Sequence, residues 1–179
     1  ASVRELVALG RRAREEYPFI GDVVRRRVAR IPGPQGVGTR RLESENDLLS
    51  IDRQADGVKT GHTDGAGYSL VGHATSAPRR MGLYVAIIGE PSRDQRARDA
   101  KRLLDWGFRQ YSRVAALPPG GEIMRVPVRD RPGVTVPVAA ATPMSVTVRL
   151  GAQLSRTVVA PAEVVAPMAK GTVVGKVTV

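Results

Sequence analysis

The tripeptide Lys59-Thr60-Gly61 has the residue types and the spacing to bind a peptide substrate. Alternate side chains of a strand share a face, so Lys59 can project its ammonium into a cleft while Gly61 leaves room for a substrate backbone. A glycine-rich run from His62 to Tyr68 follows it. Because a lone Lys-Thr-Gly occurs by chance in many chains, the competing interpretation is a basic tripeptide on an exposed strand. The flanking sequence must decide between the two.

Three strands and one helix are the elements that must position this motif. Residues 57–61 and 68–74 predict two strands joined by a turn. Residues 81–88 are continuously apolar and predict a third antiparallel strand, covered on both faces. Ser92 then caps a helix that packs against the sheet. The apolar side of this helix is predicted to carry Ala97, Ala100, Leu103, Leu104 and Phe108, with Trp106 also in core packing.

The segment before the motif predicts a helix and then irregular structure. Ser2 caps the helix, Glu5 completes a capping box, and Pro18 should end it. Short strands are expected around residues 23–28 and 39–42, on either side of a loop rich in proline and glycine.

The composition changes after Tyr111. From Val114 onward the chain is rich in valine, threonine, proline and glycine, and short alternating stretches replace helix-forming sequence. This pattern predicts a small all-β module. We therefore expect an α+β protein with two domains, residues 1–112 and residues 113–179.

Charge and composition exclude several function classes. The net charge of +11 over 179 residues comes mostly from arginine and attracts polyanions as a class. The arginines are scattered and accompany no nucleic-acid-binding motif, so nucleic acid is not an expected partner, whereas peripheral membrane contact stays open. Cysteine is absent, and the spacing of His62 and His73 fits no metal motif, so neither a metal nor a cofactor is expected.

Four stretches carry a family resemblance: Asp-Gly-Val-Lys-Thr-Gly-His-Thr, Gly-Ala-Gly-Tyr-Ser-Leu-Val, the strand ending Ile-Ile-Gly, and Leu-Leu-Asp-Trp-Gly-Phe. Together they resemble low-molecular-mass penicillin-binding proteins, specifically D-alanyl-D-alanine carboxypeptidases of the penicillin-binding protein 5 type. The resemblance runs from Ser2 to about Tyr111 and includes an Asn-x-Leu-Leu at residues 46–49. Beyond residue 113 only position and β character match.

The resemblance implies the fold and the cellular setting. Residues 1–112 would be the C-terminal half of a β-lactamase/transpeptidase-like catalytic domain, and residues 113–179 the β-rich domain that follows it. The expected ligands are the D-Ala-D-Ala peptides of peptidoglycan and β-lactams. An exported protein of the bacterial cell envelope, periplasmic or otherwise outside the cytoplasm, is also implied.

The same resemblance implies a role for each motif residue. Lys59 would help position the catalytic serines, and Thr60 would hydrogen-bond the terminal carboxylate of the substrate. The backbone N–H of His62 would be one of two oxyanion-hole donors. Arg96 matches the arginine that attracts the substrate carboxylate, with a solvated surface arginine as the alternative. The expected substrate-binding set also includes Gly61 and Thr63.

The chain departs from the family pattern in three places. None of its four lysines has a serine three positions earlier, so the nucleophilic Ser-x-x-Lys motif is not in the sequence. A literal Ser-x-Asn at residues 44–46 ends only 13 residues before Lys59 and is interpreted as coincidental. Family members often have arginine directly before the asparagine of Asn-x-Leu-Leu, where this chain has Glu45. A second carboxylate contact is therefore not expected from that position.

We expect part of a serine-type carboxypeptidase that removes the terminal D-alanine from peptidoglycan peptides through an acyl-enzyme. The isolated chain is not expected to be competent, because the nucleophile would come from an N-terminal portion. That portion, or a second copy of the chain, should cover apolar surface of strands such as residues 81–88. A non-catalytic fragment that binds cell wall or a partner is the first alternative, and a class A-like β-lactamase is the second. The β-rich module argues against the β-lactamase.

Overall fold

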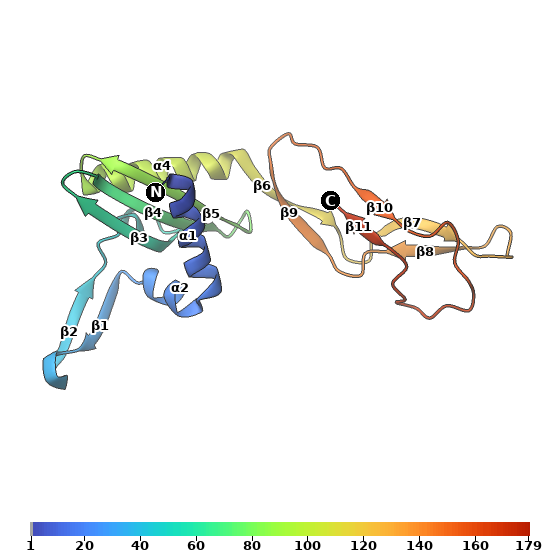
Figure 1. The fold of residues 1–179 in the computed structure, drawn as a ribbon, viewed down its shortest axis with the longest axis horizontal. Coiled ribbons are helices and arrows are strands. Elements are labelled where there is room, and N and C mark those ends of the chain that lie inside the picture. The colour runs from blue at the N-terminus through green and yellow to red at the C-terminus, as the bar shows by residue number, and fades with distance from the viewer. Residues whose placement is uncertain (1) are drawn as a thin grey trace. The chain divides into compact units, whose positions relative to one another are not determined.

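The computed structural model describes residues 2–179, which form two compact units that divide between Gln110 and Tyr111 (Figure 1). The assignment of residues 1–112 and 113–179 as domains stays a prediction. The helices of the first unit are α1 (Val3–Glu16), α2 (Pro18–Val24), the 3₁₀ turn η1 (Pro34–Gly36), α3 (Leu48–Ile51) and α4 (Arg93–Gln110). Its strands are β1 (Val28–Pro32), β2 (Thr39–Glu43), β3 (Ala55–Thr63), β4 (Gly67–Ser76) and β5 (Met81–Glu90).

A three-stranded antiparallel sheet in the order β3-β4-β5 carries the Lys-Thr-Gly motif. The three strands expected from the sequence are confirmed, and no strand end extends more than two residues beyond the expected bounds. In the register of the first pair, Gly61 lies opposite Ser69 and His62 opposite Tyr68. Among the strands of residues 2–179, β3 pairs only with β4, so the motif lies on an edge strand of the sheet.

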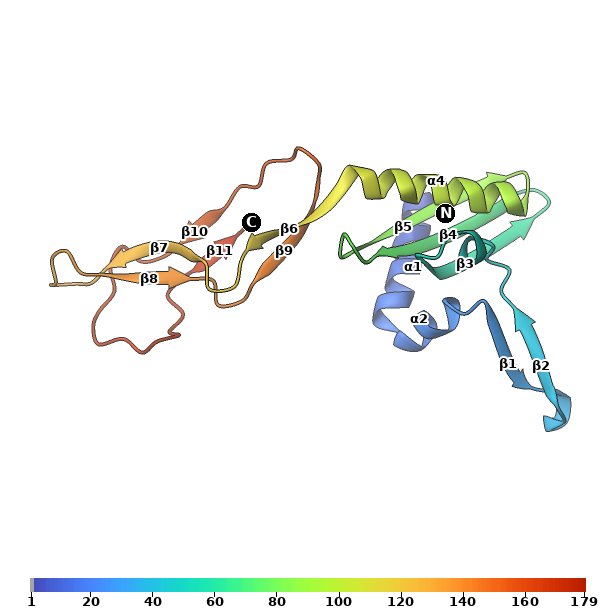
Figure 2. The same cartoon turned by 180° about the vertical axis from the view of Figure 1, so that it is seen from behind.

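Helices cover both faces of this sheet (Figure 2). On one face, an added Cβ at Gly107 of α4 would lie 2.8 Å from Leu83, and one at Gly72 would lie 2.9 Å from Leu48 of α3. On the opposite face, a Cβ at Gly10 of α1 would lie 2.7 Å from Val71. The helices thus approach the sheet closely where glycine leaves space, and the core forms between α3, α4 and the strands. Its most buried side chains include Leu48, Leu49, Leu70 and Leu104.

The N-terminal helix begins as expected and the region after it does not. The Ser2 hydroxyl accepts the Glu5 N–H at 3.3 Å, and the Glu5 carboxylate accepts the Ser2 N–H at 2.7 Å, which confirms the capping box. The helix ends before Pro18, but this proline opens α2, because its fixed φ suits a first helical position. The strand expected at residues 23–28 is therefore wrong. The β1–β2 hairpin starts only at Val28.

The apolar side of α4 is narrower than expected. The Ser92 hydroxyl accepts the Gln95 N–H at 3.1 Å and confirms the cap. Leu104 and Phe108 are buried, whereas Leu103 is 48% exposed and Trp106 is 50% exposed, so their placement in the core is wrong. Leu103, three residues after the buried Ala100, lies at the edge of the buried stripe, and Trp106 lies on the side of the helix away from it.

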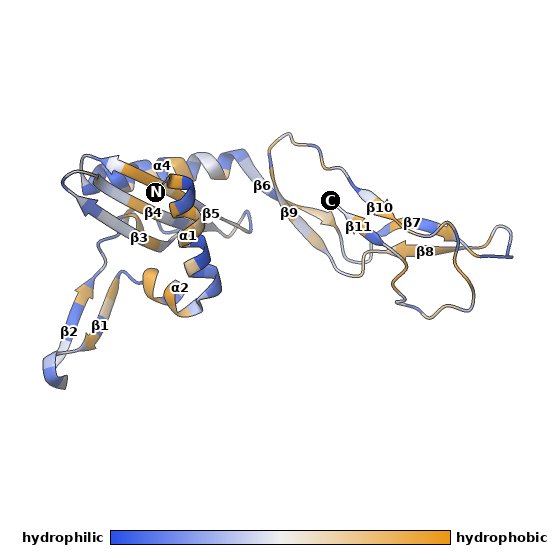
Figure 3. Cartoon of the chain, in the orientation of Figure 1, coloured by the Kyte–Doolittle hydropathy of each residue, from blue (hydrophilic) through white to orange (hydrophobic). Residues whose placement is uncertain are grey.

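The uncovered apolar surface also lies elsewhere than expected. In β5 the side chains of Met81, Val85 and Ile87 are buried and that of Ile88 is 50% exposed, so this strand exposes less apolar surface than expected. Leu9 of α1 is 65% exposed and Phe19 of α2 is 78% exposed. The hydropathy colouring shows apolar residues along both helices (Figure 3). None of the helices that the structure describes is both long and apolar enough to cross a membrane.

The second unit consists of three strand pairs. The pairs are β6 (Tyr111–Leu117) with β9 (Met144–Arg149), β7 (Glu122–Pro127) with β8 (Thr135–Ala139), and β10 (Thr157–Val159) with β11 (Lys176–Thr178). Val126, Val128 and Val164 form a small core, with Met124 and Val136 among the side chains packed on it. The elements described here are all strands, which agrees with the β character that the sequence predicts.

Candidate substrate-binding site

A cavity of about 490 Å³ opens beside the motif strand. It is lined by Glu45, Lys59, Thr60, Gly61, His62, Tyr68, Arg93 and Arg96. These residues come from the segment before α3, the end of β3, the start of β4 and the first turn of α4. The structure therefore brings together every site residue expected from the sequence except Thr63.

The motif residues leave open space on the edge of the sheet. The Lys59 side chain is exposed, and its ammonium donates a hydrogen bond to the carbonyl of Thr60. A Cβ added at Gly61 would meet no atom within 4 Å. The backbone of β3 is thus accessible at this point, as a strand that receives an extended peptide must be.

The end of β3 is held by an aromatic contact. The His62 and Tyr68 rings stack with centroids 4.0 Å apart and planes 30° apart. The side chain of His62 is therefore in a packing contact, while its backbone belongs to the strand. Thr63 does not line the cavity, since its hydroxyl accepts the Ala66 N–H at 3.1 Å within the turn to β4.

Arg96 is buried rather than solvated. Its side chain is 3% exposed, which contradicts the alternative of a surface arginine. Nη2 donates to the carbonyl of Glu45 at 2.8 Å and lies 3.4 Å from Asp47, while the guanidinium carbon lies 5.8 Å from the centre of the Tyr68 ring. Burial lowers the pKa of Arg96, an effect that the negative charge of Asp47 opposes.

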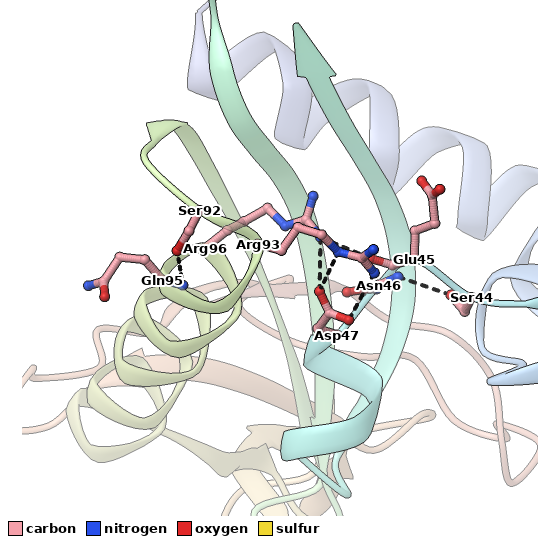
Figure 4. Close-up of polar contacts among 8 residues, drawn as sticks. All are labelled: Ser44, Glu45, Asn46, Asp47, Ser92, Arg93, Gln95 and Arg96. Atoms are coloured by element: carbon pink, nitrogen blue, oxygen red, sulfur yellow. Dashed lines mark hydrogen bonds and ion pairs between the residues drawn. The ribbon is translucent and has the colours of Figure 1, made fainter. Parts of the chain in front are cut away.

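Sequence reasoning missed Arg93, Glu45 and Tyr68 as cavity residues. Arg93 donates from both Nε and Nη2 to Asp47, each at 3.1 Å (Figure 4). This hydrogen bond raises the pKa of Arg93. Because the two residues are 46 positions apart in the chain, no local spacing could have revealed the pair. The only local signal was the position of Arg93 directly after the Ser92 cap.

A second polar cluster ties α1 to the sheet at the other end of β3. Asp56 contacts Nδ1 of His73, accepts from Arg14 Nη2 at 2.8 Å, and accepts from the Thr75 hydroxyl at 3.0 Å. Burial by itself would raise the pKa of Asp56, but the bond from His73 and the charge of Arg14 outweigh it and lower that pKa. The His73 side chain makes this contact from within the sheet, where it is 5% exposed. Among residues 2–179 no group of three or more acidic or histidine side chains could hold a metal ion.

Comparisons with known proteins agree with the motif and the fold. No protein-family model matches the chain. The D-alanyl-D-alanine carboxypeptidase DacA of Escherichia coli (strain K12) is 41% identical over 91 residues, covering 51% of this chain and 22% of that relative. The chain is homologous to D-alanyl-D-alanine carboxypeptidases of the penicillin-binding protein 5 type. DacC of the same strain is 34% identical over 142 residues, 76% of this chain and 35% of that relative.

Among solved structures, penicillin binding protein 5 from Haemophilus influenzae matches with a TM-score of 0.66 and 28% identity. The match covers 99% of this chain and 51% of that one. The homology expected from the sequence and the α+β fold class are thereby confirmed. This chain spans 22% and 35% of the length of the two curated relatives, and the match does not by itself assign to it the activity of a whole carboxypeptidase.

Proposed function

We propose that this chain is the substrate-binding part of a serine-type D-Ala-D-Ala carboxypeptidase that acts on peptidoglycan peptides. The observation that carries the proposal is the placement of Lys59-Thr60-Gly61 on an open edge strand that lines a cavity with Arg93 and Arg96. An extended peptide would bind as an added strand beside β3, with its terminal carboxylate toward the arginines. The homology to D-alanyl-D-alanine carboxypeptidases supports this substrate class.

The proposed reaction proceeds through an ester intermediate. A serine hydroxyl, supplied from outside this chain, attacks the carbonyl carbon between the two terminal D-alanines. The amide bond breaks and free D-alanine leaves, its nitrogen taking up a proton. Water then attacks the ester, releasing the shortened peptide and restoring the hydroxyl. A β-lactam would acylate the same serine when its ring amide opens.

In that reaction the residues of this chain would bind the substrate and stabilise the negative charge that develops on its carbonyl oxygen. The backbone N–H of His62 would donate to the oxygen that becomes negative when the carbonyl is attacked. The Thr60 hydroxyl would donate to the terminal carboxylate, and Arg96 would supply positive charge near it. Lys59 would hold positive charge beside the incoming serine. Thr63, which lies outside the cavity, stays a prediction.

We further propose where the portion with the nucleophile docks. A cavity of about 400 Å³ lies between α1, α2 and the motif strands, with apolar lining from Leu6, Leu9, Ile20 and Val24. Leu9 is 65% exposed, so burial of this apolar surface by another part of the protein would stabilise the fold. A second copy of the chain is the alternative occupant.

The proposed location is the bacterial cell envelope, where peptidoglycan is found.

A non-catalytic role is the second candidate, and one observation favours it: the chain has no serine three positions before any lysine. Intact mass spectrometry of the native protein, before and after incubation with penicillin, separates the two roles. The carboxypeptidase role predicts that the protein, or a companion polypeptide associated with it, gains the mass of one penicilloyl group. An unchanged mass for every associated polypeptide would leave only the binding role.

A further inference from the structure

The two arginines of the cavity share one carboxylate. Asp47 takes both hydrogen bonds from Arg93 and also lies 3.4 Å from Arg96. Glu45 gives Arg96 only its backbone carbonyl, and its side chain turns away from this contact (Figure 4). The two guanidinium groups and the ammonium of Lys59 face two carboxylates, those of Asp47 and Glu45, so positive charge is still in excess by one in and beside the cavity. Such a site attracts an anionic group.

The two arginines differ in what they can still offer to a ligand. The Arg96 side chain is 3% exposed, and its Nη2 already bonds the segment before α3. The Arg93 side chain is 51% exposed and also lines the cavity. Its pair with Asp47 uses Nε and Nη2, so the two hydrogens on Nη1 take no part in that pair. Arg93 therefore keeps donor capacity on an accessible guanidinium.

The position of Arg93 is fixed from both sides. Its backbone begins α4 directly after the Ser92 cap, and its guanidinium plane is held by two bonds of 3.1 Å to Asp47. A guanidinium held in this way loses little freedom when it binds, which favours a directed contact with a carboxylate. Position 45, where the family resemblance leads one to expect a second arginine, carries a carboxylate here.

We propose that Arg93 is a substrate-binding residue that donates from Nη1 to the terminal carboxylate of the ligand, with Asp47 as its positioning residue. In this arrangement Arg96 mainly anchors the segment 45–47 and Tyr68, and Arg93 supplies the exposed cation of the cavity. The inference rests on the proposed recognition of a D-Ala-D-Ala terminus. It names a residue for that recognition which the sequence did not single out.

The test is an NMR titration of the ¹⁵N-labelled 179-residue chain with acetyl-D-alanyl-D-alanine and with its C-terminal amide. The wild type should bind the acid more tightly than the amide. Arg93→Gln should weaken binding of the acid about tenfold, the loss typical of a charge-assisted hydrogen bond, and leave the amide unchanged. Arg93→Lys keeps the positive charge but not the planar guanidinium with its paired donors. Its affinity for the acid should fall severalfold, and its affinity for the amide should not change. Arg98→Gln is the matched control, since Arg98 is exposed on the same helix and pairs with Asp94.

The outcomes separate this inference from the proposed function. If the wild type prefers the acid and Arg93→Gln keeps the same preference, the role of Arg93 is overturned while carboxylate recognition stands. If the wild type binds acid and amide equally, the proposed recognition fails and the role of Arg93 fails with it. Unchanged backbone amide signals outside the cavity show that each variant keeps its fold.

Discussion

Replacing Asp56 by asparagine should destabilise the first unit substantially. The carboxylate of Asp56 receives contacts from His73, Arg14 and Thr75, whose elements are β4 and α1. The side chains of Asp56 and Arg14 are only 23% and 25% exposed, and that of His73 is 5% exposed. Asp56→Asn therefore removes a charge from a partly buried cluster and leaves the Arg14 charge without its carboxylate.

The size of the effect follows from this burial. Breaking a fully buried ion pair costs about 3–5 kcal/mol, and an exposed pair contributes roughly 0–1 kcal/mol. A cluster about three-quarters buried falls between them, so we expect a loss of about 2–3 kcal/mol at neutral pH. Because the folded-state pKa of Asp56 is lowered, this stability is present above the unfolded pKa of the carboxyl. This stability is lost as the pH falls through the folded pKa. The free energies of unfolding of the wild type and of Asp56→Asn should therefore converge in acid.

The assay is urea unfolding followed by the fluorescence of the single tryptophan, Trp106 in α4. This probe reports on the first unit. Asp94→Asn is the control, because Asp94 is 67% exposed in its pair with Arg98 and should change stability by less than about 0.5 kcal/mol. A loss below about 0.5 kcal/mol for Asp56→Asn, or a difference from wild type that does not shrink in acid, would refute the reasoning.

Three further predictions concern the core and the cavity. Leu104→Ala should cost about 2–5 kcal/mol in urea unfolding, whereas Leu103→Ala, at an exposed position of the same helix, should cost little. Thr60→Val should weaken binding of acetyl-D-alanyl-D-alanine about fivefold to tenfold in the same NMR titration, and equal affinity would remove Thr60 from the site. Glu45→Gln should strengthen binding of that acid by a few-fold at low salt and less at high salt, and a salt-independent effect would contradict an electrostatic cause.

Local sequence signals predicted the elements that carry the motif. Each of these signals depends only on residues a few positions apart in the sequence. They are the apolar run at residues 81–88, the glycine-rich turn before Tyr68 and the helix cap at Ser92, and each is found in the structure. At Pro18 the same kind of signal correctly predicted the end of α1 but missed the start of α2. A proline both ends a helix and suits the start of another, so it could not distinguish a loop from α2.

The interior of the site could not be predicted from such signals. The pairing of Arg93 with Asp47 and the bond from Arg96 to Glu45 join positions about fifty residues apart. They depend on how α4 packs beside the segment before α3, which no periodicity encodes. Resemblance singled out Arg96 by position, whereas burial and donor geometry give Arg93 the accessible charge.

Release of D-alanine from diacetyl-L-lysyl-D-alanyl-D-alanine by the native protein, purified with any polypeptide that accompanies it, tests the central claim most directly. The account predicts release from this peptide, loss of that release after treatment with penicillin, and little release from the corresponding C-terminal amide. Release that is absent, or equal for the acid and the amide, would contradict a carboxypeptidase whose cavity recognises the terminal carboxylate.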